Sequence, residues 1–271
     1  MMDIISILAI NAASLIIVIL LLWAYSVRIR DVSFIDAFWA FGMVLLAWAT
    51  WAQSTMPGAR SHLLLALTTL WGLRLTLHLW IRWRAHGEDP RYTKIMASRM
   101  KKTGWSWSKT SLHSVFLTQA PLLFITCLPA QLGIWASEGG RTVIGPLGAL
   151  GAAIALIGIA FETIGDAQLD SFRKDPANKG KVLDTGLWRY TRHPNYFGDA
   201  CTWWGIWLIA AETGLPGWIS IIGPLFLTFT LTKWSGKPLL EYGMKKTRPG
   251  YAEYVARTSG FFPLPPKKGE I

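Results

Sequence analysis

The sequence contains little cysteine. Among 271 residues there are two cysteines, Cys127 and Cys201, and both lie in apolar runs. No C-x-x-C pair and no zinc-ligand spacing is present, which argues against a disulfide framework or a metal site. We therefore expect two ordinary buried thiols and no bound metal.

Charge is also scarce. Charged residues make up 16% of the chain and apolar residues 52%, a balance too apolar for an ordinary soluble domain. The sequence has no Gly/Ser linker, no low-complexity tract and no convincing internal repeat, so a single membrane domain over 1–271 is the simplest interpretation. Runs of about 20 mostly apolar residues can cross a bilayer as helices. We predict an all-α integral membrane protein with seven transmembrane helices at 4–27, 34–53, 61–83, 110–135, 143–170, 196–212 and 216–234.

The few charges are distributed unevenly along the chain. Of the 27 Lys and Arg residues, 24 fall in the segments 28–33, 82–109, 171–195 and 233–271. Seven helices put all four segments on one face, which the positive-inside rule assigns to the cytoplasm. The N-terminus is then outside and the C-terminus cytoplasmic. Because topology alone requires much of this basic excess, we do not expect nucleic acid as a partner. We expect the lipid bilayer as a partner, and a monomer.

Ionisable side chains inside the predicted spans are candidate functional residues, because they cost free energy unless they face protein or water. Arg74 and His78 are four residues apart and share a helix face. Asp36 lies near the start of the second span, where an aspartate also suits a helix N-terminus.

Carboxylates recur along the fifth span. Glu162, Asp166 and Asp170 follow i, i+4, i+8 spacing and form one acidic stripe, and Arg173 follows three residues later. Stacked carboxylates repel one another unless a partner donates hydrogen bonds to them. Ribose hydroxyls or an amide would do so.

The stretch "RHPNYFGD", residues 192–199, opens the sixth span. Pro194 fits the first turn of a helix, and Asn195, Asp199 and Trp203 then recur every four residues on one face. The free N–H groups of a helix N-terminus suit a phosphate. The spacing therefore predicts a site for a ligand with several phosphates, surrounded by the cations Arg173, Lys174, Lys179, Lys181, Arg189 and Arg192.

Six motifs occur in a fixed order: "DAFWAFG", "LWGLRL", "GEDPRY", "GLWRYTRHPNYFGD", "WWG" and "SGKPLLE". Together they resemble the bacterial branch of the steroid 5α-reductase family, integral membrane enzymes that use NADPH, over residues 31–263. The resemblance implies seven transmembrane helices in a bacterial inner membrane, with the cofactor site facing the cytoplasm. It also implies reduction of a C=C bond conjugated to a ketone, typically the Δ4 bond of a 3-oxo steroid.

The resemblance assigns roles to residues. Hydride goes from the nicotinamide to the β-carbon while an acid polarises the carbonyl oxygen. Asp36 is the nearest counterpart of a family glutamate, but the family's tyrosine falls on Trp71, which cannot protonate a substrate. Tyr92, His78 or Asp36 itself then supplies the acid. The candidate cofactor contacts are Arg74, Arg84, Glu162, Asp166, Arg173, Lys181, Tyr190, Arg192, His193, Asn195, Tyr196, Asp199, Trp203, Lys237 and Glu241.

Two other functions remain open. Isoprenylcysteine methyltransferases carry stretches similar to "RHPNY", which allows a membrane methyltransferase that uses S-adenosylmethionine. That cofactor has no phosphate, so the cations around the N-terminus of the predicted sixth span favour NADPH. A non-enzymatic lipid-binding or transport protein is the third reading, in which Asp36, Glu162 and Asp199 relay protons. The sequence shows no inverted repeat of the kind many transporters have.

Overall fold

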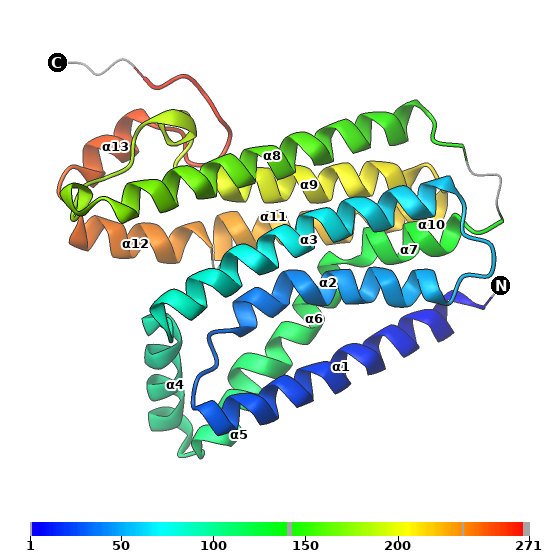
Figure 1. Ribbon diagram of the computed structural model, residues 1–271, viewed down its shortest axis with the longest axis horizontal. Coiled ribbons are helices and arrows are strands. Elements are labelled where there is room, and N and C mark those ends of the chain that lie inside the picture. Colours follow the sequence, from blue (N-terminus) through cyan, green and yellow to red (C-terminus); the bar gives the residue numbers. More distant parts are fainter. Residues whose placement is uncertain (1, 140–142, 235, 268–271) are drawn as a thin grey trace. The chain divides into compact units, whose positions relative to one another are not determined.

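The computed structural model describes residues 2–139, 143–234 and 236–267. Within these ranges the regular structure is helical, and strand-like pairing is limited to isolated bridges (Figure 1). The fold class predicted from the sequence is therefore confirmed as all-α. Backbone contacts divide the chain into two compact units. Unit 1 comprises Met1–Ala149 and Ile206–Gly223, and unit 2 comprises Leu150–Gly205 and Pro224–Ile271. A single membrane domain stays a prediction.

Unit 1 is built on three long helices, of which α2 and α3 pack most extensively against each other. Gly72 of α3 explains how close they come, because a Cβ there would collide with Val44 and lie 3.0 Å from the carbonyl oxygen of Ala40. The helices of this unit are α1 (Ile4–Ile29), α2 (Ile35–Ala52), α3 (Ala59–His86), α4 (Pro90–Thr103), α5 (Trp107–Ser111), α6 (Leu117–Thr126), α7 (Leu128–Ala136) and α10 (Leu215–Ile219).

A buried polar cluster joins three helices of unit 1. The Nδ2 of Asn11 on α1 donates to Thr50 Oγ1 of α2 at 2.7 Å and to Gln131 Oε1 of α7 at 2.9 Å. All three side chains are buried. Hydrogen bonds of this kind join helices where no water is available to satisfy the polar groups.

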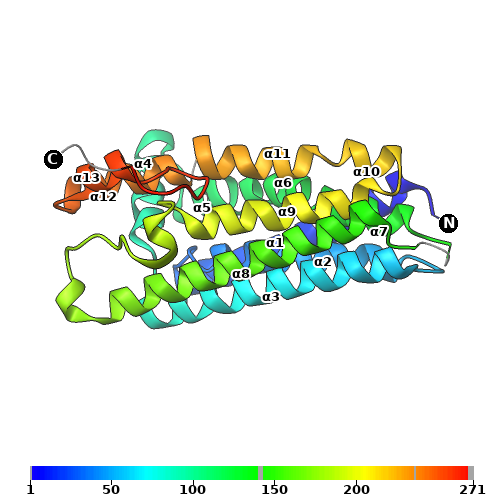
Figure 2. The ribbon, with the colours of Figure 1, turned by 90° about the horizontal axis from the view of Figure 1, so that it is seen from above.

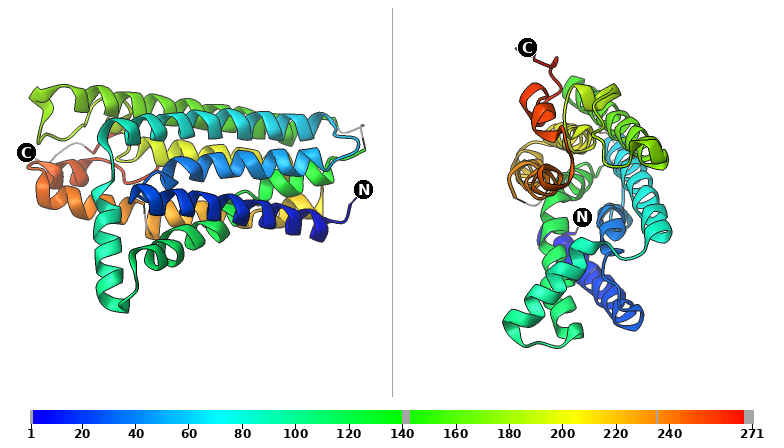
Figure 3. Two further views of the ribbon diagram at one scale, coloured as in Figure 1. Left: turned by 60° about the horizontal axis from the view of Figure 1, so that its bottom comes forward. Right: turned by 90° about the vertical axis from the view of Figure 1, so that its left-hand side faces the viewer.

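Helix α4 runs across the direction of α1, α2 and α3 instead of alongside them (Figure 3). The two ends of α4 are set by the residues that cap them. The Asp89 side chain caps its first turn by accepting from the backbone N–H of Arg91 at 2.9 Å, and Pro90 opens that turn. Gly104, with a φ of 68°, ends the helix in the left-handed conformation. The sequence treated this segment only as a basic loop.

The segment predicted to span at 110–135 is bent. It consists of α5, a π-helical turn at Leu112–Phe116, α6 and α7, with a bend of 46° between Thr126 and Leu128. Pro129 stands in the first turn of α7 and cannot continue the helical hydrogen bonding of α6. This proline accounts for the break.

Unit 2 centres on α8 and α9, which lie side by side (Figure 2). A Cβ at Gly158 would lie 2.5 Å from the carbonyl oxygen of Gly198, and one at Gly198 would lie 2.5 Å from the backbone nitrogen of Glu162. Gly158 and Gly198 therefore allow the close packing of α8 against α9. The helices that contribute to this unit are α8 (Pro146–Lys174), α9 (Pro194–Ala211), α11 (Ile222–Phe229), α12 (Lys237–Thr247) and α13 (Tyr251–Arg257), with a π-helical turn at Thr230–Trp234.

Five of the predicted spans coincide with helices long and apolar enough to cross a membrane, and the bent α5–α7 segment is a sixth candidate. This is consistent with an integral membrane protein. The predicted span at 196–212 is the helix α9, Pro194–Ala211, which is not among those six. Polar residues in its first turns lower its apolarity. The five candidates are Ile4–Ile29, Ile35–Ala52, Ala59–His86, Pro146–Lys174 and Leu215–Trp234.

Candidate functional site

Buried acidic side chains gather in unit 2 where α8 meets the start of α9. Glu162, Asp166 and Asp199 are 3%, 5% and 6% exposed. The Asn195 amide joins the two helices, because its Nδ2 donates to Asp166 Oδ1 at 3.2 Å. Its Oδ1 accepts from the backbone N–H of Tyr196 at 3.1 Å, which fixes the orientation of the amide. The structure thus brings together residues that the sequence placed on separate helices.

The segment before α9 is fixed by backbone and hydroxyl contacts. The backbone N–H of Arg192 donates to the carbonyl of Ser259 at 2.9 Å, and the Thr191 hydroxyl donates to the carbonyl of Phe261 at 2.8 Å. Pro194 then begins the helix. The C-terminal segment of the chain therefore holds the entry to α9 in one conformation.

Arg192 lies inside unit 2, with 8% of its surface exposed. Its Nε donates to Glu241 Oε1 at 2.9 Å, and its Nη1 donates to the carbonyls of Val255 at 3.2 Å and Thr258 at 2.5 Å. A guanidinium with this many internal acceptors holds α12 and α13 against the start of α9. The sequence assigned Arg192 and Glu241 to cofactor contacts, and their geometry favours a positioning role.

His193 shares the same carboxylate. Its Nε2 lies 3.0 Å from Glu241 Oε1, so the neutral ring carries its proton on Nε2. Burial lowers the pKa of His193, which Glu241 only partly offsets. Burial disfavours the charged form of Glu241 as well, but hydrogen bonds from His193 and Arg192 outweigh it and lower its pKa to about 2. At neutral pH the cluster therefore holds a carboxylate, a guanidinium and a neutral imidazole.

Three aromatic candidates differ in their surroundings. Tyr196 stacks on His193, with ring centroids 5.3 Å apart and planes 6° from parallel. Trp203 is fully buried two turns into α9, whereas Tyr190 is 43% exposed. Tyr196 is therefore placed to order the histidine, and Tyr190 is open to a ligand.

A basic pocket of about 240 Å³ lies at the C-terminal end of α8. Three of its cations, Arg173, Lys174 and Lys179, were predicted to lie near the N-terminus of the sixth span. The fourth is Arg248, from the end of α12. Sequence reasoning missed Arg248 because nothing in the chain pairs it with α8. Lys181 is exposed in the following loop, and Lys237 is half-buried at the start of α12.

In unit 1 the structure brings two catalytic candidates into contact. The Tyr92 hydroxyl donates to Asp36 Oδ1 at 2.5 Å, and Arg91 Nη2 pairs with Asp36 Oδ2 at 2.9 Å. Burial raises the pKa of Tyr92 well above its ordinary value, and the Asp36 carboxylate raises it further. The sequence shows Arg91 as one of the cations of the 82–109 segment, but its pairing with Asp36 was not predicted.

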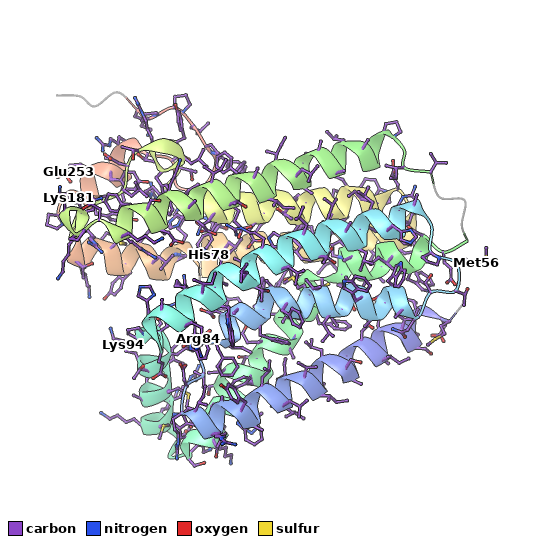
Figure 4. All side chains as sticks on the ribbon, in the orientation of Figure 1. Met56, His78, Arg84, Lys94, Lys181 and Glu253 are labelled. Atoms are coloured by element: carbon purple, nitrogen blue, oxygen red, sulfur yellow. The ribbon has the colours of Figure 1, made fainter. Side chains whose placement is uncertain are left out.

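The remaining candidates of unit 1 lie on α3. His78 follows Arg74 by one helical turn, as predicted, and both are half-buried. Arg84 is exposed near the C-terminal end of α3, the end from which the chain passes into α4 (Figure 4). Within the ranges the structure describes, no group of three or more His, Cys, Asp or Glu side chains could hold a metal ion.

Comparison with known proteins gives a family match and two relatives. A "Probable O-methyltransferase ustE" of Ustilaginoidea virens is 30% identical over 139 residues, which cover 51% of this chain and 47% of that protein. The chain thus matches about half the length of this relative. "Uncharacterized protein C594.04c" of Schizosaccharomyces pombe is 22% identical over 274 aligned positions, covering 89% of this chain and 75% of that protein. No solved structure matches significantly.

The family match covers most of the chain. The family described as "Protein of unknown function (DUF1295)" matches residues 22–258, which include the α8–α9 cluster, the Arg192 contacts and the Asp36–Tyr92 pair. The chain therefore belongs to the DUF1295 family.

Proposed function

We propose that the protein is a membrane enzyme that binds NADPH in unit 2 and reduces a C=C bond conjugated to a ketone in a steroid-like lipid. The observation that carries this proposal is the Asp166–Asn195 pair, with Glu162 and Asp199 buried nearby, in the same unit as the basic pocket. Carboxylates and amides accept hydrogen bonds from ribose hydroxyls, and Arg and Lys bind phosphates. A phosphorylated dinucleotide requires both kinds of group.

The residues of unit 2 fit such a cofactor by their donors and acceptors. When bound, NADPH supplies the hydride for the β-carbon of the enone. Asn195 and the carboxylates of α8 and α9 would bind and orient its ribose and amide groups. The cations of the basic pocket, Arg173 and Arg248 among them, would hold its phosphates. The Arg192–Glu241 pair would fix the helix start that presents these groups.

The carbonyl-polarising role is assigned to Tyr92 with Asp36. A tyrosine whose pKa is raised stays protonated at neutral pH, so its hydroxyl remains a hydrogen-bond donor. Asp36 and Arg91 fix the position of that hydroxyl. The hydroxyl has one proton, which it donates to Asp36 in this structure, so on substrate binding it would turn from Asp36 to the carbonyl oxygen. A donor placed there stabilises the developing enolate without giving up its proton. The proton on the α-carbon then comes from a separate group or from water.

The proposed topology is the one expected from charge. It has seven spans, with α9 as the sixth, the N-terminus outside and the C-terminus on the cytoplasmic side of a bacterial inner membrane, in a monomer. Met56 and Lys181 test it, since both are exposed and seven spans would put the loops that carry them on opposite sides of the membrane. An impermeant maleimide should label Met56→Cys on intact cells and leave Lys181→Cys unlabelled. Equal labelling of the two would refute the topology.

Methyl transfer is the second candidate function. The observation in its favour is the similarity to a protein named as a probable O-methyltransferase. In this reading the buried carboxylates of α8 and α9 would bind the ribose and the amino group of S-adenosylmethionine. The basic pocket argues for NADPH, because S-adenosylmethionine has no phosphate.

Calorimetric titration of the detergent-purified protein distinguishes reduction with NADPH from methyl transfer with S-adenosylmethionine. We expect binding of NADPH, weaker binding of NADH, and no binding of S-adenosylmethionine. Arg248→Gln should weaken NADPH binding, whereas Lys245→Gln, an exposed cation of the same helix, should not. If the protein binds S-adenosylmethionine and does not bind NADPH, methyl transfer replaces reduction as the proposed function. If NADPH binds, its oxidation in the presence of 3-oxo-Δ4 steroids then tests the substrate class.

A further inference from the structure

Two pairs of a cation and an indole ring lie near the point where α1 ends beside α5. The Arg30 guanidinium carbon is 5.2 Å from the centre of the Trp107 ring, and Lys109 Nζ is 4.8 Å from that of Trp105. These four residues are called the Arg30 cluster below. The indole N–H of Trp23 on α1 donates to the carbonyl of Ser108 at 3.0 Å, which joins the two helices. Each cation lies within the range of a cation–π contact.

The backbone at Arg30 is in an unusual conformation. Its φ is 59°, and no other non-glycine residue in the described ranges has a positive φ. It ends α1 in the left-handed region, where glycine is the ordinary residue because it has no Cβ to clash. A residue with a Cβ adopts this conformation at a cost of about 1–2 kcal/mol.

The cations of the Arg30 cluster are not neutralised by the protein. Within the part of the chain that the structure describes, neither Arg30 nor Lys109 forms an ion pair. The adjacent carboxylate, Asp31, accepts instead from Ser33 and from the Trp83 indole at 2.7 Å. Three further basic residues nearby in the chain are exposed: Arg28, Lys101 and Lys102. The cluster therefore offers positive charge to an external anion.

The apolar surface that leads to the cluster is exposed. Ile17, Leu21 and Tyr25 follow one another by four residues on α1 and are 59%, 65% and 47% exposed. Arg28 continues this stripe one turn later. A helix face of this kind in a membrane protein lies against lipid tails, and indoles and cations at its end lie among the headgroups.

We propose that the Arg30 cluster binds the phosphate headgroup of an acidic phospholipid whose tails lie along the Ile17–Leu21–Tyr25 stripe. Arg30 and Lys109 neutralise the phosphate, and the Trp105 and Trp107 rings orient the two cations. The site belongs to unit 1 and does not depend on cofactor binding in unit 2. It requires a net negative headgroup, so phosphatidylglycerol should bind and the zwitterionic phosphatidylcholine should not compete at equal concentration.

The test uses the full chain in neutral detergent, with lipid binding followed by native mass spectrometry and by thermal shift. Arg30→Gly is the informative variant, because glycine adopts the left-handed conformation without strain and the fold should be retained. We expect phosphatidylglycerol to raise the parent's melting temperature and phosphatidylcholine to leave it unchanged. Arg30→Gly and Lys109→Gln should each weaken phosphatidylglycerol binding about fivefold, the loss expected for one cation near a headgroup.

Lys245→Gln removes an exposed positive charge from unit 2 and serves as the charge-matched control, with unchanged lipid binding. Equal phosphatidylglycerol binding by the parent, Arg30→Gly and Lys109→Gln would overturn the proposal. So would an equal response of the parent to phosphatidylcholine. A matching thermal shift with inorganic phosphate alone would also overturn it, because the cluster would then bind a soluble anion instead of a lipid.

Discussion

Tyr92 donates a hydrogen bond of 2.5 Å to Asp36 although 56 positions separate the two residues in the chain. Asp36 stands in the first turn of α2 and Tyr92 in the first turn of α4. Helix α4 begins a few residues after the end of α3, which packs against α2, and its first turn meets the start of α2. Arg91 binds the second carboxylate oxygen, so Asp36 is held from both sides.

Removing the Tyr92 hydroxyl should slow catalysis without affecting cofactor binding. Tyr92→Phe keeps the ring and the Arg91–Asp36 ion pair but loses the only donor assigned to the carbonyl oxygen. We expect single-turnover oxidation of NADPH to fall by about 10²-fold or more, in the range of acid–base and oxyanion contributions. The NADPH dissociation constant, measured by calorimetry, should be unchanged.

His78→Gln is the companion variant, since His78 was the other candidate acid. A normal rate in Tyr92→Phe together with a slow rate in His78→Gln would assign the acid to α3. Normal rates in both would refute a side-chain acid at either position.

Asn195→Ala should weaken cofactor binding. The variant removes a donor to the buried Asp166 carboxylate, and a hydrogen bond to a charged group contributes about 1.5–3 kcal/mol. If the same amide also contacts the cofactor, the NADPH dissociation constant should rise by about tenfold or more. Thr163→Ala, on the exposed side of α8, is the control. Affinities that stay equal in all three proteins would remove Asn195 from the cofactor site.

Much of the fold follows from the sequence because membrane helices are encoded by long apolar runs. The boundaries of α1, α2, α3 and α8 lie within a few residues of the expected spans. The helical phase also places Asn195 and Asp199 one turn apart, and the i, i+4 spacing of Glu162 and Asp166 puts both on one side of α8. Local periodicity thus predicts which residues share a helix face.

Contacts between distant segments could not be predicted in the same way. Nothing in the sequence near Arg192 indicates that it would bind the carbonyls of Val255 and Thr258, because backbone acceptors have no sequence signature. A cation before a helix N-terminus was interpreted as a phosphate ligand for that reason. The contribution of Arg248 to the basic pocket was missed for a related reason, because its position depends on how α12 ends.

Acid should unfold the protein partly through Glu241. Its pKa is lowered from 4.5 to about 2 in the folded state, so its contribution to stability is complete above pH 4.5 and is lost as the pH falls from there toward 2. The lowered pKa of His193 acts in the same direction, since protonation of the buried ring opposes folding below its ordinary pKa of 6.5. In Glu241→Gln, the melting temperature should fall less steeply between pH 4.5 and 2 than in the parent.

At neutral pH, Glu241→Ala should lower the free energy of unfolding by about 3–5 kcal/mol, the cost of leaving a buried cation with carbonyl acceptors but without its carboxylate partner. Arg192 is that cation. Melting curves of the parent and the Glu241 variants that stay parallel at every pH would show that the carboxylate is not linked to folding.

The close approach of α8 and α9 gives a prediction independent of any ligand. In Gly198→Ala the new Cβ would lie 2.5 Å from the backbone nitrogen of Glu162 and 2.6 Å from the carbonyl oxygen of Gly158. Both neighbours are backbone atoms and cannot rotate away, so the helices must separate, at a cost of about 1–3 kcal/mol or more. The separation would also displace Asn195 from Asp166, so cofactor affinity should fall together with the melting temperature.

Gly243→Ala is the matched control for this effect. Gly243 lies within α12, and a Cβ there would meet no heavy atom within 4 Å. Alanine is favoured over glycine inside a helix by about 1 kcal/mol, so this variant should melt at the same temperature as the parent or slightly higher. A stable Gly198→Ala would mean that α8 and α9 do not approach this closely in the membrane, and the Asn195–Asp166 hydrogen bond would lose its structural basis.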